Sequence, residues 1–160
     1  MTPYIPAPDP ITSAWLTAVL RASGALTHGE VLAVNSAPTG AFNSHTSHLQ
    51  LHYSDAASGL TTNMILKRNL PEPWAVEAGA EEVAFYRLVA ALPDRPPAIV
   101  PCYAAAYDAV SGNSYLLLHD LSATHAHPVT REQLICITDA VPLPLLIECV
   151  IDTLSQHHAY

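Results

Sequence analysis

The chain has 160 residues, half of them hydrophobic and only 12% charged, with a formal net charge of −8 at pH 7. This composition predicts an ordered core and excludes wholesale disorder. Six cations against fourteen acids argue against binding to a phosphate backbone, so we expect no nucleic-acid partner.

Three features of the sequence bear on where the protein is located. The longest apolar stretch, residues 141–151, is interrupted and too short to cross a bilayer. The N-terminus lacks the pattern of a signal peptide, and the three cysteines show no C-x-x-C spacing. An odd number of cysteines suits reduced thiols. We therefore expect a soluble, cytoplasmic protein without a membrane partner.

The first part of the chain predicts a short helix followed by two strands. Thr12 or Ser13 can cap the helix, whose apolar residues recur at helical spacing until Gly24. Thereafter the apolar period changes to two, which predicts one strand near residues 31–33 and another near residues 46–53. On the second strand we expect the leucines to face one side and the histidines the other.

The middle of the chain predicts a third strand, a long helix and two further strands. The third strand is an apolar run, Met64–Arg68, that contains the only lysine of the chain, Lys67. After two prolines comes the best helical pattern, at about residues 76–92, and a Pro-rich stretch ends it. The last two strands are expected at residues 99–107 and 113–118, joined by a turn.

Beyond residue 120 the pattern becomes helical again. Thr130 and Gln133 form a capping-box pair, and apolar residues at helical spacing mark a last helix. This pattern is still running at Tyr160, without a residue that closes a helix, so it indicates an interruption. We expect a fragment or a truncated gene product, with a genuine short protein as the alternative.

Lys67 and a helix glutamate are the most informative pair of charges. A lysine beside a strand can hold the phosphates of a nucleotide while a helix-borne glutamate fixes its position. Glu82 is the candidate partner because it shares the apolar face of the long helix with Phe85 and Tyr86. Glu81 is the rival, because it also has apolar neighbours. The structural alternative is a lysine whose stem lies along apolar surface and a solvated glutamate.

Five short motifs follow one another at suitable intervals: Ile65-Leu66-Lys67, Glu82-x-x-Phe85-Tyr86, Val100-Pro101, Leu116-Leu117-Leu118-His119-Asp120-Leu121 and His158-Ala159. With the order of the elements, they resemble the aminoglycoside phosphotransferase and choline-kinase-like family, in its branch of small-molecule kinases related to ecdysteroid kinases. The resemblance covers about residues 10–160. It extends over the N-terminal lobe and only the start of the C-terminal lobe.

The resemblance implies an α+β fold in two parts. Residues 1–118 would form a protein-kinase-like N-terminal lobe that binds a nucleotide. That lobe is a five-stranded antiparallel sheet with one main helix packed on it. Residues 119–160 would form the hinge and the first helices of an incomplete, helical C-terminal lobe.

The resemblance also assigns residues to the phosphate side of a nucleotide site. Lys67 matches the lysine that binds the α- and β-phosphates of ATP, and Glu82 matches the helix glutamate that pairs with it. The turn that contains Gly40, Asn43 and Ser44 matches the loop over the phosphates, where backbone N–H groups are the donors. An ordinary hairpin loop explains this turn equally well.

The hinge of the family matches the end of the fifth strand. Backbone groups near Leu118 and His119 would hydrogen-bond the adenine edge, and Leu116 or Ile65 would pack on the ring. A buried strand that enters a loop explains the leucines equally well. His119-Asp120-Leu121 lacks the arginine and the following asparagine of a kinase catalytic loop, so we assign it no catalytic role.

The function that the resemblance implies is ATP-dependent phosphoryl transfer to a hydroxyl of a small molecule, with Mg²⁺ in a full-length protein. The family places its base and magnesium ligands in an H-x-D-x-x-x-x-N segment and a following Asp. That segment does not occur in these 160 residues, so no catalytic residue is assigned and we expect no transfer by this chain alone. The acceptor stays open among aminoglycoside, sterol, choline-like and acyl-type substrates.

Two alternatives come from other classes of protein. The first is a non-catalytic nucleotide-binding or interaction module, in which apolar residues such as Leu146 and Val150 contact a partner or a second copy. The second is a metal protein that uses some of the nine histidines. The histidines lack an H-E-x-x-H motif or a Cys/His cluster, so we assign no metal ligands.

Overall fold

The computed structural model describes residues 3–39, 41, 43–57, 59–94 and 96–125. The helices predicted beyond residue 126, with Thr130, Gln133, Leu146 and Val150, lie outside these ranges, as does the predicted site residue Gly40. No helix within the described ranges is long and apolar enough to cross a membrane.

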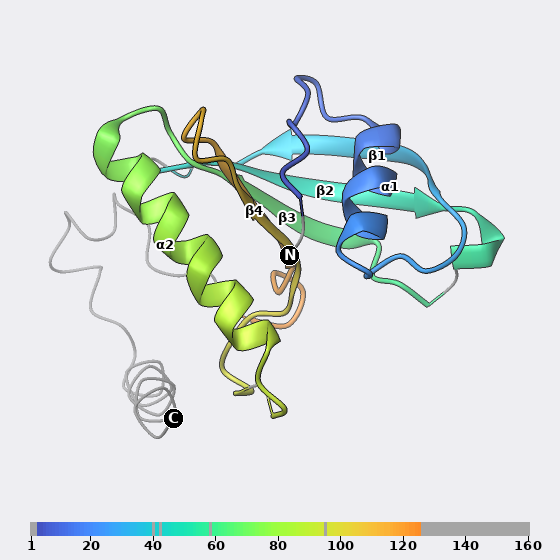
Figure 1. Ribbon diagram of the computed structural model, residues 1–160. Coiled ribbons are helices and arrows are strands. Elements are labelled where there is room, and N and C mark those ends of the chain that lie inside the picture. The colour runs from blue at the N-terminus through green and yellow to red at the C-terminus, as the bar shows by residue number, and fades with distance from the viewer. Residues whose placement is uncertain (1–2, 40, 42, 58, 95, 126–160) are drawn as a thin grey trace, which may run out of the picture. The chain divides into compact units, whose positions relative to one another are not determined.

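Residue contacts divide the chain into two units. The first unit comprises residues 1–93 and 101–120, and it contains every helix and strand of the described residues (Figure 1). The second unit comprises residues 94–100 and 121–160. Its described residues form turns, in one of which the Ile99 N–H donates to the Pro96 carbonyl at 3.1 Å.

Five strands of the described residues form one antiparallel sheet in the spatial order β1-β2-β3-β5-β4, so the fold is α+β as predicted. The first three strands form the expected meander, and β5 lies between β3 and β4. The last strand pair starts later than predicted, because residues 99–101 lie outside β4 and β5 begins at Ser114. The strands are β1 (Val31–Pro38), β2 (His45–Tyr53), β3 (Asn63–Arg68), β4 (Cys102–Tyr107) and β5 (Ser114–His119).

The first helix, α1 (Ser13–Ala22), begins at a cap that the sequence predicts. The Thr12 side chain accepts a hydrogen bond from the Trp15 N–H at 3.3 Å. The helix buries one apolar stripe against the sheet. Gly24 follows with a φ of 81°, a left-handed conformation that suits glycine after a helix.

The second helix, α2 (Pro73–Ala90), starts earlier than predicted because a proline occupies its first turn. Its most buried stripe is Ala75, Gly79 and Val83, at intervals of four residues. Val89 is also buried, but the expected packing of Phe85 on the apolar face is wrong, since this side chain is 44% exposed. Phe85 follows Val83 by two residues, about 200° around the helix, so it faces away from the buried stripe.

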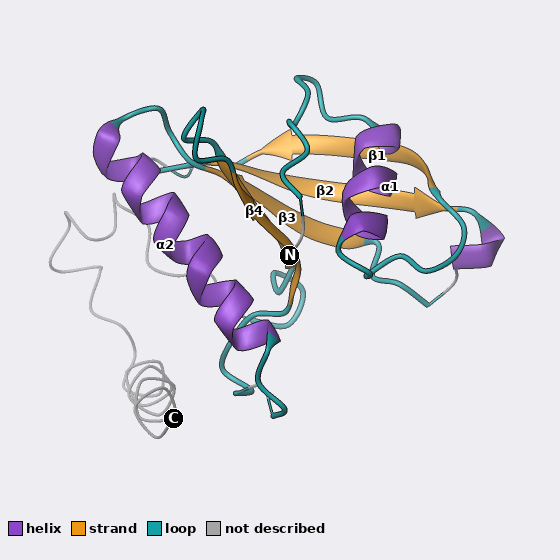
Figure 2. Ribbon diagram, in the orientation of Figure 1, coloured by secondary structure: helices purple, strands orange, loops and turns teal. Residues whose placement is uncertain are grey.

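The two helices pack on opposite faces of the sheet (Figure 2). Alternating residues of β5 show this division, because Tyr115 and Leu117 join the α1 cluster whereas Leu116 joins Val83 of α2. Leu49 of β2 lies in the α1 cluster at 1% exposure, as the predicted alternation of that strand requires.

The proline-rich N-terminal segment also lies against the α1 cluster. The indole N–H of Trp15 donates to the Ile5 carbonyl at 3.0 Å. The ring of Tyr4 packs on that of Tyr115, with 5.6 Å between their centroids. The segment is therefore partly buried against the core of the first unit.

Candidate functional site

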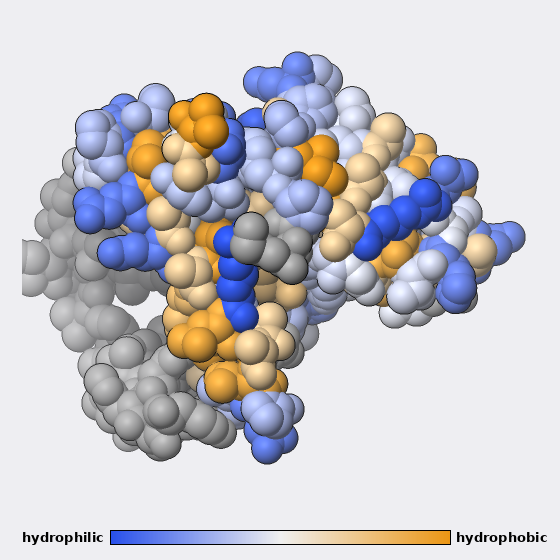
Figure 3. Space-filling view, viewed as in Figure 1, coloured by the Kyte–Doolittle hydropathy of each residue, from blue (hydrophilic) through white to orange (hydrophobic). Residues whose placement is uncertain are grey.

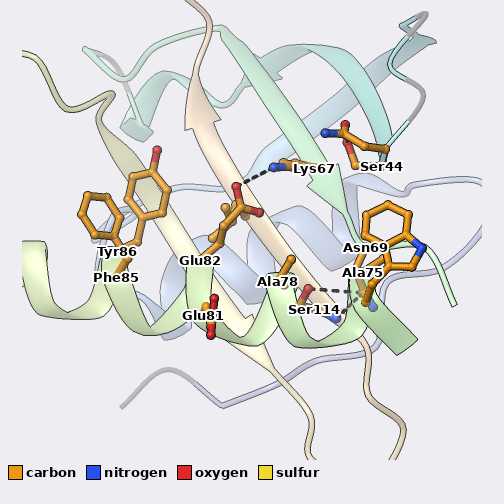
Figure 4. A pocket seen from close by; sticks show the side chains of 14 residues that line it. Ser44, Lys67, Asn69, Ala75, Ala78, Glu81, Glu82, Phe85, Tyr86 and Ser114 are labelled. Carbon is orange, nitrogen blue, oxygen red and sulfur yellow. Dashed lines mark hydrogen bonds and ion pairs between the residues drawn. The ribbon is translucent and has the colours of Figure 1, made fainter. Parts of the chain in front are cut away.

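A cleft of about 510 Å³ lies between α2 and the face of the sheet that α1 does not cover (Figure 4). Its volume falls in the range of small-molecule sites. Side chains from β3, α2, the β1–β2 turn and the start of β5 line it. Its polar and aromatic lining includes Asn43, Ser44, Lys67, Glu81, Glu82 and Trp74.

Lys67 reaches the cleft because of the alternation of β3. Leu66 is buried on the α1 side at 1% exposure, so the next residue points to the opposite face. There the Lys67 Nζ donates to the Glu82 Oε1 at 2.5 Å. Figure 4 shows Glu82 directed to the lysine and Glu81 directed away from it, so Glu82 is the partner.

The solvent exposure of Lys67 and Glu82 indicates how much their ion pair contributes to stability. The side chains of Lys67 and Glu82 are 29% and 42% exposed. An ion pair so open to water contributes only about 0–1 kcal/mol to stability. The pair therefore adds little to the fold, and the ammonium remains accessible from the cleft.

The β1–β2 turn brings Ser44 beside Lys67 (Figure 4). Ser44 is buried, and its Oγ lies 2.9 Å from the Oγ1 of Thr46, the cross-strand neighbour of Lys67. Asn43 is exposed at the edge of the cleft and accepts a 3.4 Å hydrogen bond from the Ser44 hydroxyl. Two of the three predicted turn residues thus lie at the cleft with Lys67.

Of the residues predicted for the adenine side, Leu116 lines this cleft, whereas Leu118 and His119 do not. Leu118 pairs with Ile65 across the sheet. The His119 ring Nδ1 lies 2.9 Å from the Tyr103 hydroxyl, and the His119 backbone N–H donates to the Pro101 carbonyl at 2.8 Å. That N–H already has an acceptor within the protein.

Asn69 is a site residue that the sequence reasoning missed. Its Oδ1 accepts from the Ser114 backbone N–H at 2.7 Å, and its Nδ2 donates to the Gly112 carbonyl at 3.0 Å. These bonds tie the end of β3 to the start of β5 at the floor of the cleft. An asparagine directly after an apolar strand was the only signal in the sequence.

Trp74 is a second missed residue of the cleft wall. It lies in the first turn of α2 and is 55% exposed.

At the other end of the cleft, burial raises the pKa of Tyr86, with Cys102 and the Glu82 carboxylate as further causes. The phenol therefore stays protonated and can donate a hydrogen bond at neutral pH.

A further polar contact connects β2 with the segment that follows β5. The His48 Nδ1 of β2 lies 2.9 Å from the Asp120 Oδ2. His48 stands opposite Ile65 in the register, on the same face as the cleft. The described part of the chain contains no group of three His, Cys, Asp or Glu residues that could hold a metal ion.

No family model matches the chain, and neither a curated protein nor a solved structure matches it. Any functional conclusion therefore depends on the geometry of the cleft and on the motifs of the sequence.

Proposed function

We propose that the chain binds ATP in the cleft between β3 and α2, as the nucleotide side of an ATP-dependent phosphotransferase that acts on a hydroxyl of a small molecule. The observation that carries the proposal is the 2.5 Å contact between the Lys67 ammonium and the Glu82 carboxylate inside this cleft. A strand lysine held by a helix glutamate is the arrangement by which a kinase-like site positions the α- and β-phosphates.

The residues of the cleft fit phosphate oxygens in chemical terms. The ammonium of Lys67 is a compact point charge that suits phosphate. Glu82 would hold the ammonium in place and balance its charge before ATP arrives. The Ser44 hydroxyl, on the sheet side of the cleft, would add a donor beside the lysine.

The transfer step itself needs a base and magnesium ligands. We assign neither role to a described residue. In this proposal Lys67, Glu82 and Ser44 bind and orient the nucleotide, and Leu118 and His119 remain predictions for the adenine side.

A titration of ATP into four forms of the protein tests the proposal. Lys67→Ala should weaken binding about tenfold or more, because a charge-assisted contact to phosphate is lost. Glu82→Gln should weaken it by about three- to tenfold, since the lysine is no longer fixed. Glu81→Gln is the matched control, with the same chemical change one residue away, and should alter affinity less than about twofold.

The fluorescence of the exposed Trp74 at the cleft gives the readout, with calorimetry as a second measurement. Equal effects of the two glutamate variants, or unchanged ATP affinity in Lys67→Ala, would refute the proposed site.

A second candidate function is a non-catalytic interaction module. One observation favours it, because α2 exposes Trp74, Phe85 and Leu88 at 55%, 44% and 66%. Hydrophobic surface is visible around the C-terminal half of this helix (Figure 3). If this candidate is correct, Leu88→Asp should abolish association measured by sedimentation, and the protein should show no ATP-dependent phosphorylation of hydroxyl compounds.

A further inference from the structure

A second cleft lies at the end of the sheet under the N-terminal segment. Its volume is about 340 Å³, and its lining includes Tyr4, Asp9, His45, Arg68 and Asn113. Asn69 and Ser114 border both clefts, but no residue of α2 lines this one. It therefore opens beside the ATP cleft and presents a different set of side chains.

Arg68 is the residue that gives this cleft its chemistry. It stands between His45 and Tyr115 in the register, and it faces the side opposite to Lys67. Its Nε is buried and has no hydrogen-bond partner among the described residues. Within the same residues, neither ion pair includes Arg68.

The guanidinium of Arg68 thus lacks both an acceptor for its Nε–H and a carboxylate partner among the described residues. The guanidinium stays charged in proteins, and a buried donor without an acceptor costs free energy. The planar edge of a guanidinium matches the two oxygens of a carboxylate, to which it donates two parallel hydrogen bonds. A carboxylate placed against the guanidinium would give this charge the ion-pair partner that the described residues do not supply.

The neighbours of Arg68 restrict the ligand further. Burial and the Asp108 carboxylate raise the pKa of Tyr4, so its hydroxyl stays protonated and can donate to an anion. The amide of Asn113 supplies further donors at the wall. The carboxylate of Asp9 also lines the cleft and repels a multiply charged anion. This combination favours an anion of single charge.

We propose that this second cleft binds the carboxylate group of a small molecule, with Arg68 as the anchor and Tyr4 as a second donor. The site is independent of the proposed ATP site, because Lys67 and Arg68 point to opposite faces of β3. Acetate is the probe for the carboxylate, and inorganic phosphate is the probe for a multiply charged oxyanion.

An NMR titration of the full chain with acetate tests this site. The Nε–H signal of Arg68, identified by its loss in Arg68→Lys, should shift and saturate. Arg68→Lys keeps the charge but loses the planar fork, and it should weaken acetate binding about tenfold. Tyr4→Phe should weaken binding about threefold, through the loss of one hydrogen bond.

Arg87→Lys is the matched control. The Nε of Arg87 is also buried and without a hydrogen-bond partner among the described residues, but Arg87 does not line the cleft. This variant, and Lys67→Ala, should leave acetate affinity within about twofold of the parent value. A shift that does not saturate, equal affinity in Arg68→Lys, or tighter binding of phosphate than of acetate would each overturn the proposal.

Discussion

At the scale of single residues, two adjacent cations of β3 have contrasting surroundings. The Lys67 ammonium has a carboxylate at 2.5 Å, whereas the Arg68 Nε has no hydrogen-bond partner within the described ranges. The alternation of a strand sends the two side chains to opposite faces. A chain with only six lysines and arginines thus places two of them at the end of one strand, each beside its own cleft.

Another residue-scale feature is the turn that joins β4 to β5. The Asp108 carboxylate accepts from the Ser111 hydroxyl at 2.7 Å and from the Val110 N–H at 3.2 Å. These hydrogen bonds, the Ser111 contact first, hold the pKa of Asp108 below its ordinary value. A folded-state pKa below the unfolded one stabilises the protein above the unfolded pKa, and this contribution disappears as the pH falls through the folded value.

We therefore predict a pH-dependent effect of Asp108→Asn. At pH 7 the variant should lose up to about 2 °C in Tm, because an exposed charged acceptor contributes little. The difference from the parent protein should shrink below about pH 4 and vanish once Asp108 is protonated. Thermal melts across this range measure it. Asp94→Asn is the control, since the exposed Asp94 accepts no side-chain hydrogen bond from a described residue; a difference that grew in acid would contradict the prediction.

At the scale of elements, strands were more predictable than the packing of α2. The period of two in β2 correctly placed Leu49 and Leu51 on the buried face, because a half-buried strand must alternate. The buried stripe of α2 contains Ala75 and Gly79, whose small side chains carry little hydrophobic signal. The aromatic residues have the stronger hydrophobic signal, and they predicted a packed Phe85, whose side chain is instead exposed.

The same contrast applies to the candidate site. A lone lysine in an apolar strand was visible in the sequence, and its pairing with Glu82 follows from a strand beside a helix. Asn69 was missed because its partners, Gly112 and Ser114, are more than forty residues away along the chain. The second cleft was missed for a related reason, since it depends on the N-terminal segment that folds back over Tyr115.

The contact between α2 and β5 gives a prediction about Gly79. A Cβ at this position would meet the Ser114 Oγ closely and lie 3.1 Å from the Asn69 Cβ. Overpacking costs about 1–3 kcal/mol. The better helix propensity of alanine offsets about 1 kcal/mol of this. Gly79→Ala should therefore lower the free energy of unfolding by about 1 kcal/mol.

A double-mutant cycle with Ser114→Ala isolates the cause. Removal of the Ser114 hydroxyl relieves the closest contact and leaves the backbone N–H bound to Asn69. In that background, Gly79→Ala should cost clearly less, with a coupling of about 1 kcal/mol in urea unfolding. Additive effects of the two substitutions would show that the close approach to Ser114 is not what requires glycine.

At the scale of the whole first unit, one sheet separates two apolar clusters of unequal size. Among the described residues, fifteen buried ones form the cluster under α1, whereas Val83, Ala105 and Leu116 form the buried part of the cluster under α2. Most of the hydrophobic stabilisation therefore lies on the α1 side, since it scales with the apolar area buried. The helix that carries Glu82 is held by the smaller cluster.

This asymmetry predicts different consequences for two substitutions of the same kind. Val19 of α1 and Val83 of α2 are 0% and 1% exposed, so valine to alanine removes two buried methyl groups in either case. Each should destabilise the protein by about 1–3 kcal/mol in urea unfolding. Only Val83→Ala should also weaken ATP binding, by about three- to tenfold, because a loosened α2 no longer fixes the carboxylate beside Lys67.

The pair of variants separates positioning from global stability. If loss of stability alone reduced ATP affinity, Val19→Ala would reduce it as much as Val83→Ala does. If the position of α2 sets the affinity, Val19→Ala keeps ATP affinity within about twofold at temperatures well below its Tm. Equal affinities of the two variants would show that α2 does not act on the nucleotide through its packing on β5. Glu82 would then hold Lys67 independently of that contact.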